Sequence, residues 1–181
     1  MIVLAGASAS GKTEVAKYLA EHYGIIKVIT TTTRAKRIHE VDGVDYFFVS
    51  KEEFQKLIKE DKFVEYTIYN DNYYGSTKDQ IAPGKCIVVD PSGLKAYHAL
   101  HNPEIVIFFL NSEEDTRYKR MLARGDDEEK AKNRIIHDRN VFTNDTIQGV
   151  DYYINSETTT VPEVAKIVLD TYQKHMAKLG K

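Results

Sequence analysis

The eight residues GASASGKT, from Gly6 to Thr13, constrain the fold of this 181-residue chain more than any other segment. They satisfy the pattern G-x-x-x-x-G-K-[ST] and stand between a short apolar run, MIVLAG, and a helical pattern over about 11–23. In such a strand–loop–helix unit the glycines let backbone N–H groups turn inward around phosphate oxygens, and the helix N-terminus adds partial positive charge. An ordinary Gly/Ser turn before a helix is the alternative, and the flanking patterns argue against it.

We therefore expect this loop to bind the phosphates of a nucleoside triphosphate. Lys12 is expected to reach the β and γ phosphates, and the Thr13 hydroxyl is expected to be offered to Mg²⁺. The loop residues are Gly6, Ala7, Ser8, Ala9, Ser10, Gly11, Lys12 and Thr13.

The remaining pattern predicts an α/β fold built on a mostly parallel sheet, because apolar strand-like runs alternate with helical segments. Strands are expected at IKVIT (26–30), CIVVD (86–90), EIVIFFL (104–110) and DYYIN (151–155). A capping box at Ser50 opens a short helix through Ile58, and Ser112 with Asp115 is expected to cap another helix. A charged helix follows, and a last amphipathic helix runs from 161 to about 178. The segment from about 30 to 83 is richer in β-type residues and is interpreted as an inserted lobe.

Composition and charge exclude several classes of protein. The net charge is −2, so no global basic field is available for nucleic acid or anionic lipid. The longest apolar run, IVIFFL, is too short to span a bilayer, and no membrane association is expected. The single Cys86 cannot form an internal disulfide, which favours a reducing, cytoplasmic location.

A second anion site is suggested by the segment TTTTRAKRIHEVDGVDYFF, residues 30–48. Arg34 and Arg37 lie three residues apart, and Tyr46 follows an expected Asp42–Gly43 turn. Two guanidinium groups near a phenol can clamp a phosphate through bidentate, charge-assisted hydrogen bonds. Taken alone, the segment is equally compatible with a solvated basic loop.

Several segments in fixed order make the chain resemble guanylate kinases. They are GASASGKT, TTTTRAKRIHEVDGVDYFFVSKEEF, FVEYTIYNDNYYGST, the strand ending at Asp90, and ARGDDEEKAKNRI, and the resemblance covers essentially the whole chain. It implies a single domain with a P-loop NTPase core (1–30, 84–120 and 145–181), an inserted β-rich GMP-binding lobe (about 31–83) and a helical lid (about 121–144). It also implies ATP-dependent phosphorylation of GMP to GDP in purine nucleotide metabolism, with Mg²⁺ as cofactor and ATP and GMP as substrates. Protein partners are not implied.

The resemblance also assigns the residues that would hold GMP. Its phosphate would be bound by Arg34, Arg37, Tyr46 and Tyr74. Its guanine would meet Glu65, Ser76 and Thr30, with Asp90 beside that site. A carboxylate at Glu65 can accept from guanine N1–H and N2–H₂, whereas adenine presents a bare acceptor at N1. Gly75 is expected to let the chain turn tightly before Ser76.

The charged segment ARGDDEEKAKNRI alone is typical of an exposed helix with many ion pairs. The resemblance makes it a lid whose Arg124 and Arg134 close over the transferring phosphoryl group, and it brings Asn155 toward the donor base. No general base is expected, because the acceptor phosphate is already largely ionised at neutral pH. Transfer would depend instead on positioning and charge neutralisation by Lys12, Mg²⁺ and the four arginines.

The chain departs from the family pattern at a few positions. Ala7 stands where Pro is usual and Ala9 where Gly is common, although both positions are free in the general motif. Asp126 stands where a Thr normally follows the lid glycine, which adds a negative charge near the donor phosphates. The segment VVDPSG retains Asp90 but lacks the first acid of the family's Asp-x-Asp.

Two other functions fit parts of this pattern. A guanylate-kinase-like scaffold domain would bind protein rather than nucleotide, but such domains lose the phosphate loop and lid arginines that this chain retains. A kinase of the same fold with another small phosphorylated acceptor would need the donor half but not the set Glu65, Ser76 and Thr30.

Overall fold

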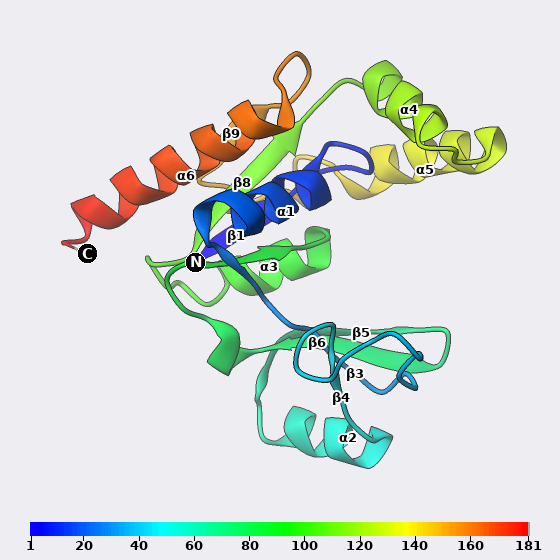
Figure 1. The fold of residues 1–181 in the computed structure, drawn as a ribbon, viewed down its shortest axis with the longest axis vertical. Coiled ribbons are helices and arrows are strands. Elements are labelled where there is room, and N and C mark those ends of the chain that lie inside the picture. Colours follow the sequence, from blue (N-terminus) through cyan, green and yellow to red (C-terminus); the bar gives the residue numbers. More distant parts are fainter. Residues whose placement is uncertain (181) are drawn as a thin grey trace.

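The main sheet of the protein is parallel, as a computed structural model describing residues 1–180 shows (Figure 1). Its order is β2-β7-β1-β8-β9, and β1 lies at its centre. The strands are β2 (Ile26–Lys27), β7 (Lys85–Val88), β1 (Ile2–Ala5), β8 (Val106–Asn111) and β9 (Tyr152–Asn155). The chain therefore has the α/β class that the alternating pattern predicts.

Side chains of β1 alternate between two apolar layers, because successive residues of a strand point to opposite faces. Ile2 and Leu4 pack in the layer formed with α1 (Lys12–Tyr23) and α6 (Val161–Lys178). Met1 and Val3 pack in the layer formed with α3 (Pro91–His98). Both faces of the sheet are covered, and this is why its strands are nearly continuous apolar runs.

A second sheet lies below the first in Figure 1 and has the order β4-β3-β6-β5. Its strands are β3 (Thr31–Thr32), β4 (Phe47–Phe48), β5 (Phe63–Tyr69) and β6 (Asn72–Thr77). Helix α2 (Lys51–Lys59) covers it, and Phe54 of α2 stacks on Phe63 with ring centroids 4.3 Å apart. Ser50 caps α2 by accepting a hydrogen bond from the Glu53 amide, as predicted. A short 3₁₀ helix, η1 (Lys78–Gln80), leads back to the first sheet.

The expected strand IKVIT is only partly correct. Its first two residues form β2 of the parallel sheet, and the chain then crosses to β3 of the second sheet. Residues 28–30 belong to no strand and connect the two sheets.

Helices α4 (Glu114–Ala123) and α5 (Glu128–Val141) pack together and form an arm at the upper right of Figure 1. The predicted cap of α4 is wrong. Helix α4 begins one residue later than a Ser112 cap requires, and its N-cap residue, Glu113, has no capping side-chain bond. Ser112 is buried instead. No helix within residues 1–180 is long and apolar enough to cross a membrane.

Candidate functional site

The loop between β1 and α1 adopts backbone conformations that disfavour most residues with a side chain. Gly6 has φ 145°, and a Cβ there would lie 2.5 Å from the Leu110 carbonyl oxygen. Ala9 has φ 60°, in the left-handed region where non-glycine residues are strained by about 1–2 kcal/mol. The family's frequent glycine at this position therefore has a physical reason, and the alanine carries a local cost.

Lys12 lies at the start of α1 and folds back over the loop. Its Nζ donates to the Ala7 carbonyl oxygen at 2.7 Å and lies 3.5 Å from Ser10 Oγ. Burial lowers the pKa of Lys12 to about 8, against the opposing effect of the nearby Asp138 carboxylate. A phosphate ligand would favour the charged form of this amine, so the lysine is well placed to gain from anion binding.

A cavity of about 500 Å³ opens beside the loop. It brings Lys12 and Thr13 together with Arg124 of the α4–α5 arm, three of the residues that the sequence predicts for the donor half. Its lining comprises residues 9–15, Arg120, Arg124, Ser156, residues 159–161 and Val164. Gly6, Ala7, Ser8 and Asn155 do not line it. Asn155 Oδ1 accepts from the Glu157 amide at 2.7 Å, a turn-forming role at the end of β9.

Arg120 was not predicted, although its spacing of four from Arg124 on one helix could have indicated a shared face. Its guanidinium donates to the Ser156 carbonyl oxygen at 2.6 Å and to that of Ala9 at 3.3 Å. Ser156 Oγ in turn donates to the Ser10 carbonyl oxygen at 3.0 Å. These bonds hold the end of β9, helix α4 and the phosphate loop together around the cavity.

A buried ion pair lies at the other side of the loop. Arg117 of α4 and Asp138 of α5 are both about 5% exposed, and their charged atoms are 3.0 Å apart. Asp138 also accepts from the Ser8 amide at 2.7 Å and from Ser8 Oγ at 3.2 Å. The pair therefore has the further hydrogen bonds that a buried charge requires.

On the second sheet, three of the predicted phosphate-binding residues come together. The Arg34 guanidinium lies 5.4 Å from the centre of the Tyr46 ring, and Tyr46 lies 6.3 Å from Tyr74 between ring centroids. Arg34 also pairs with Glu40 at 2.6 Å, and this bond raises the pKa of the arginine. Arg37 is exposed and contacts Glu40 through its backbone: its amide donates to Glu40 Oε2 at 2.8 Å, and its carbonyl oxygen accepts from the Glu40 amide at 3.1 Å. Glu40 thus pairs with the Arg34 guanidinium, which is predicted to bind the acceptor phosphate.

Glu65 and Ser76 face each other on the paired strands β5 and β6. Ser76 Oγ donates to Glu65 Oε1 at 2.6 Å, and the Ser76 amide donates to the same oxygen at 3.2 Å. Burial raises the pKa of the Glu65 carboxyl, and the charge of nearby Asp90 raises it further. Both Ser76 donors reach Oε1 and oppose this rise, and a ligand that presents further N–H groups would also stabilise the charged form.

The other predicted acceptor-side residues take supporting positions. Asp90 caps α3, its Oδ1 accepting from the Gly93 amide at 2.8 Å. Thr30 lies at the crossing between the sheets, and its carbonyl oxygen accepts from the Phe47 amide at 3.0 Å. Gly75 makes no turn, contrary to expectation: it lies within β6, where a Cβ would stand 2.8 Å from the Phe63 ring. Close packing is the reason for glycine there.

Arg124 and Arg134, the two arginines predicted to belong to a lid, share one partner, Asp126. Arg124 makes two bonds to its carboxylate, at 3.0 and 2.6 Å, and Arg134 lies 3.4 Å from it. The acid that departs from the family pattern thus neutralises both cations that are expected to meet the phosphoryl group.

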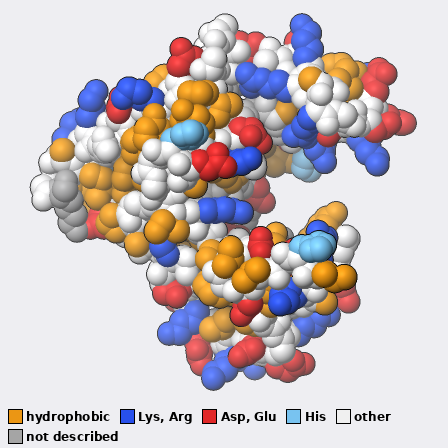
Figure 2. Space-filling view, in the orientation of Figure 1, with side chains coloured by type: hydrophobic (Ala, Val, Ile, Leu, Met, Phe, Trp, Pro, Cys, Tyr) orange, Lys and Arg blue, Asp and Glu red, His pale blue; other side chains and the backbone are white. Residues whose placement is uncertain are grey.

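The two sets of predicted site residues, one beside the loop between β1 and α1 and one on the second sheet, lie on opposite sides of the hollow seen in Figure 2. The phosphate loop belongs to the parallel sheet, while Arg34, Tyr46 and Glu65 belong to the second sheet and its loops. The sequence profile of guanylate kinases matches residues 1–158. The chain belongs to the guanylate kinase family.

Comparisons with individual guanylate kinases agree with this family membership. The enzyme of Oceanobacillus iheyensis is 32% identical in an alignment that covers 100% of this chain and 91% of that protein. The enzyme of Fusobacterium nucleatum is 33% identical over 72% of this chain and 74% of that protein. The crystal structure of guanylate kinase from Anaplasma phagocytophilum superimposes with a TM-score of 0.62 and 25% identity, covering 96% of this chain and 84% of that one. This member of the guanylate kinase family therefore resembles other members in both sequence and fold.

Proposed function

We propose that the protein transfers the γ-phosphoryl group of ATP to GMP and so forms ADP and GDP. Membership of the guanylate kinase family supports this function. The observation that carries it is the Glu65 carboxylate, partly buried and held by Ser76 on the lobe opposite the phosphate loop. Guanine presents two adjacent N–H donor groups, at N1 and N2, to such an acceptor, whereas adenine does not.

The chemistry of this proposal needs positioning and charge neutralisation rather than a base. The oxygens of GMP are already largely ionised at neutral pH, so attack on the γ-phosphorus requires no proton removal. Lys12 would hold the donor phosphates, and Arg34 and Arg37 would hold the acceptor phosphate in line. Arg124 and Arg134 would then stabilise the charge that spreads over the moving group.

Mg²⁺ belongs to the proposal as the cofactor. Thr13 lines the donor cavity next to Lys12, and within residues 1–180 no three His, Cys, Asp or Glu side chains are grouped to hold a metal. A site with one protein hydroxyl fits Mg²⁺, which keeps several waters and takes its other oxygens from nucleotide phosphates. When bound, Mg²⁺ would neutralise the phosphates of ATP.

The proposal also includes a cytoplasmic location and a place in purine metabolism. Both are supported by the substrates, and the location also by the lone, buried Cys86.

A panel of acceptors tests the proposal. Purified protein is mixed with Mg²⁺ and ATP and with GMP, dGMP, AMP, CMP or UMP in turn, and ADP formation is followed by a coupled assay. We expect equimolar ADP and GDP with GMP and little turnover with AMP, CMP or UMP, whereas dGMP, which presents the same base, measures the contribution of the sugar. Lys12→Ala should abolish transfer while its melting temperature stays close to that of the wild type. Preference for another phosphorylated acceptor would favour the same-fold kinase, and no turnover at all would favour a binding domain.

A further inference from the structure

Tyr97 is joined to the acceptor site by a chain of hydrogen bonds. Its hydroxyl donates to Ser76 Oγ at 3.1 Å, and Ser76 Oγ donates to Glu65 Oε1 at 2.6 Å. The Ser76 amide bonds the same carboxylate oxygen at 3.2 Å. One oxygen of Glu65 is therefore fixed from the protein side, and the carboxylate plane is set by Ser76.

The Tyr97 hydroxyl determines which way the Ser76 proton points. Tyr97 is 1% exposed and Ser76 is 0% exposed, so water does not compete for these groups. A serine hydroxyl has one proton and two acceptor lone pairs. Because Tyr97 donates to Ser76 Oγ, the single serine proton is left for Glu65. Burial raises the pKa of Tyr97 to about 12, so the phenol keeps the proton that it donates.

The bond from Tyr97 also crosses between the two parts of the molecule. Tyr97 lies on α3 and packs with Val3 and Leu94 in the core of the parallel sheet. Ser76 and Glu65 lie on β6 and β5 of the second sheet. A side chain that is rigid in the core thus sets the orientation of a carboxylate in the lobe.

We propose that Tyr97 is a positioning residue for guanine recognition: through Ser76 it holds the Glu65 carboxylate in the orientation that accepts from both N1–H and N2–H₂ of the acceptor base. This inference rests on the proposed function and deepens it. It assigns a selectivity role to a residue that touches no part of the substrate. Guanine should profit more from this orientation than hypoxanthine, which has N1–H but lacks the N2 amino group.

The test compares GMP with IMP in the wild type and in Tyr97→Phe, at saturating ATP. The variant retains the ring and loses only the hydroxyl. We expect the ratio of kcat/KM for GMP to that for IMP to fall by about fivefold or more, the effect of one buried hydrogen bond. The KM for GMP should rise, and the KM for ATP should stay within about twofold.

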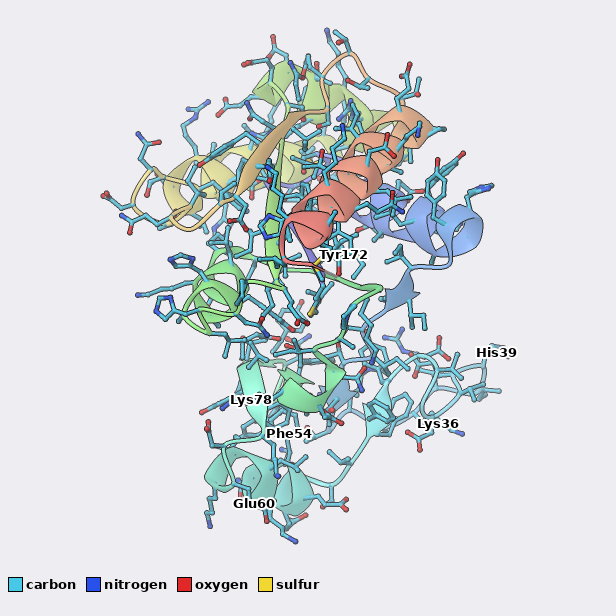
Figure 3. The ribbon with its side chains drawn as sticks, turned by 90° about the vertical axis from the view of Figure 1, so that its left-hand side faces the viewer. Lys36, His39, Phe54, Glu60, Lys78 and Tyr172 are labelled. Atoms are coloured by element: carbon cyan, nitrogen blue, oxygen red, sulfur yellow. The ribbon has the colours of Figure 1, made fainter. Side chains whose placement is uncertain are left out.

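Tyr172→Phe is the matched control. Tyr172 is a buried tyrosine on α6 whose oxygen accepts from the Met1 amino group at 2.7 Å, and it lies in the core away from the lobe (Figure 3). The variant Tyr172→Phe also loses one buried hydroxyl and one hydrogen bond. Its ratio of kcat/KM for GMP to that for IMP should nevertheless equal that of the wild type. A second test adds Tyr97→Phe to Ser76→Ala. Because the link passes through Ser76, the tyrosine change should then have no further effect on the ratio.

The outcomes separate this inference from the proposed function. If Tyr97→Phe lowers kcat/KM for GMP and IMP by the same factor, Tyr97 has only a structural role and the inference is overturned. Additive effects of the two changes, or a wild type that does not prefer GMP to IMP, also overturn it. A wild type that does not phosphorylate GMP overturns the proposed function itself.

Discussion

Asp138 Oδ2 lies 2.7 Å from the backbone nitrogen of Ser8, so helix α5 of the α4–α5 arm is hydrogen-bonded directly to the phosphate loop. The same oxygen lies 3.0 Å from the Arg117 guanidinium, and both side chains are buried. The arm and the loop are therefore joined at the base of the arm. The outer end of the arm is the turn between α4 and α5, where Gly125 has φ 91°.

Removing this carboxylate should destabilise the fold strongly. Asp138→Ala leaves the Arg117 charge buried with only carbonyl oxygens as partners and no counter-charge, and such losses cost about 3–5 kcal/mol of the free energy of unfolding. Asp170→Ala is the control, because it breaks an exposed ion pair with Lys166 on α6 and should cost at most about 1 kcal/mol. Urea denaturation measures both. Equal losses in the two variants would show that the buried pair contributes no more to the free energy of unfolding than an exposed pair.

The depressed pKa of Lys12 predicts opposite pH dependences for activity and for stability. Between about pH 8 and the ordinary value of 10.5 the unfolded chain binds more protons at this amine than the folded chain. Stability should therefore rise with pH through that window. By contrast, kcat/KM for ATP should fall above about pH 8, as the lysine loses the charge that binds phosphate.

The variant Lys12→Met serves as the reference for the measurement of stability. The difference in urea midpoint between wild type and Lys12→Met should change between pH 7 and 10 in the direction that favours the wild type. A difference that stays constant with pH, together with a kcat/KM for ATP that stays flat to pH 10, would contradict the assigned pKa.

Asp126 should restrain the lid. Asp126→Asn frees Arg124 and Arg134 from their shared carboxylate, so we expect a lower KM for ATP or a higher kcat, by about twofold to fivefold, since exposed pairs are worth about 0.2–1 kcal/mol. Raising the ionic strength should reduce the difference in KM for ATP or kcat between the variant and the wild type. Glu129→Gln removes a charge from the same segment, and within residues 1–180 no ion pair joins it to either arginine. Equal gains from both changes would point to a general charge effect.

The separation of the two halves predicts closure on substrate binding. The phosphate loop and the second sheet face each other across the hollow in Figure 2, so in-line transfer requires them to approach. A bisubstrate inhibitor that joins adenosine and guanosine through phosphates should reduce the radius of gyration in solution scattering. Adenosine diphosphate alone should reduce it less. An unchanged radius at saturating inhibitor would count against closure.

Local patterns predicted the elements well where the sequence itself contains the signal. The helix after the phosphate loop ends at Tyr23, before Gly24, and the last helix spans Val161–Lys178, as expected from periodicity and capping. The cap of α4 failed because Ser112 is buried, where its hydroxyl lies 3.5 Å from Arg120 Nη1, and the helix starts among the three acids that follow it. Gly75 was mistaken for a turn residue because a glycine needed for close packing has the same signature.

The sequence did not predict the polar contacts between residues that are distant along the chain. Ser8 and Asp138 are 130 positions apart, and nothing in either local segment indicates that they meet. The same is true of Tyr97, which looks like one apolar position of an amphipathic helix until Ser76 is placed against it. Arg34 and Glu40 are near in sequence, but their bond depends on the loop conformation between them. Side-chain partners follow from topology, which a single sequence does not specify.

The most direct test of the central claim is steady-state kinetics of Glu65→Gln with GMP varied at saturating ATP. The amide has the same size, but it has lost the charge and turns an N–H donor toward guanine. Loss of a charge-assisted bond in a buried site costs about 1.5–3 kcal/mol, so kcat/KM for GMP should fall by about tenfold to 150-fold. The KM for ATP should barely change, and turnover of AMP should not fall. Unchanged GMP kinetics would show that Glu65 does not read the base and would contradict the assignment of guanine specificity.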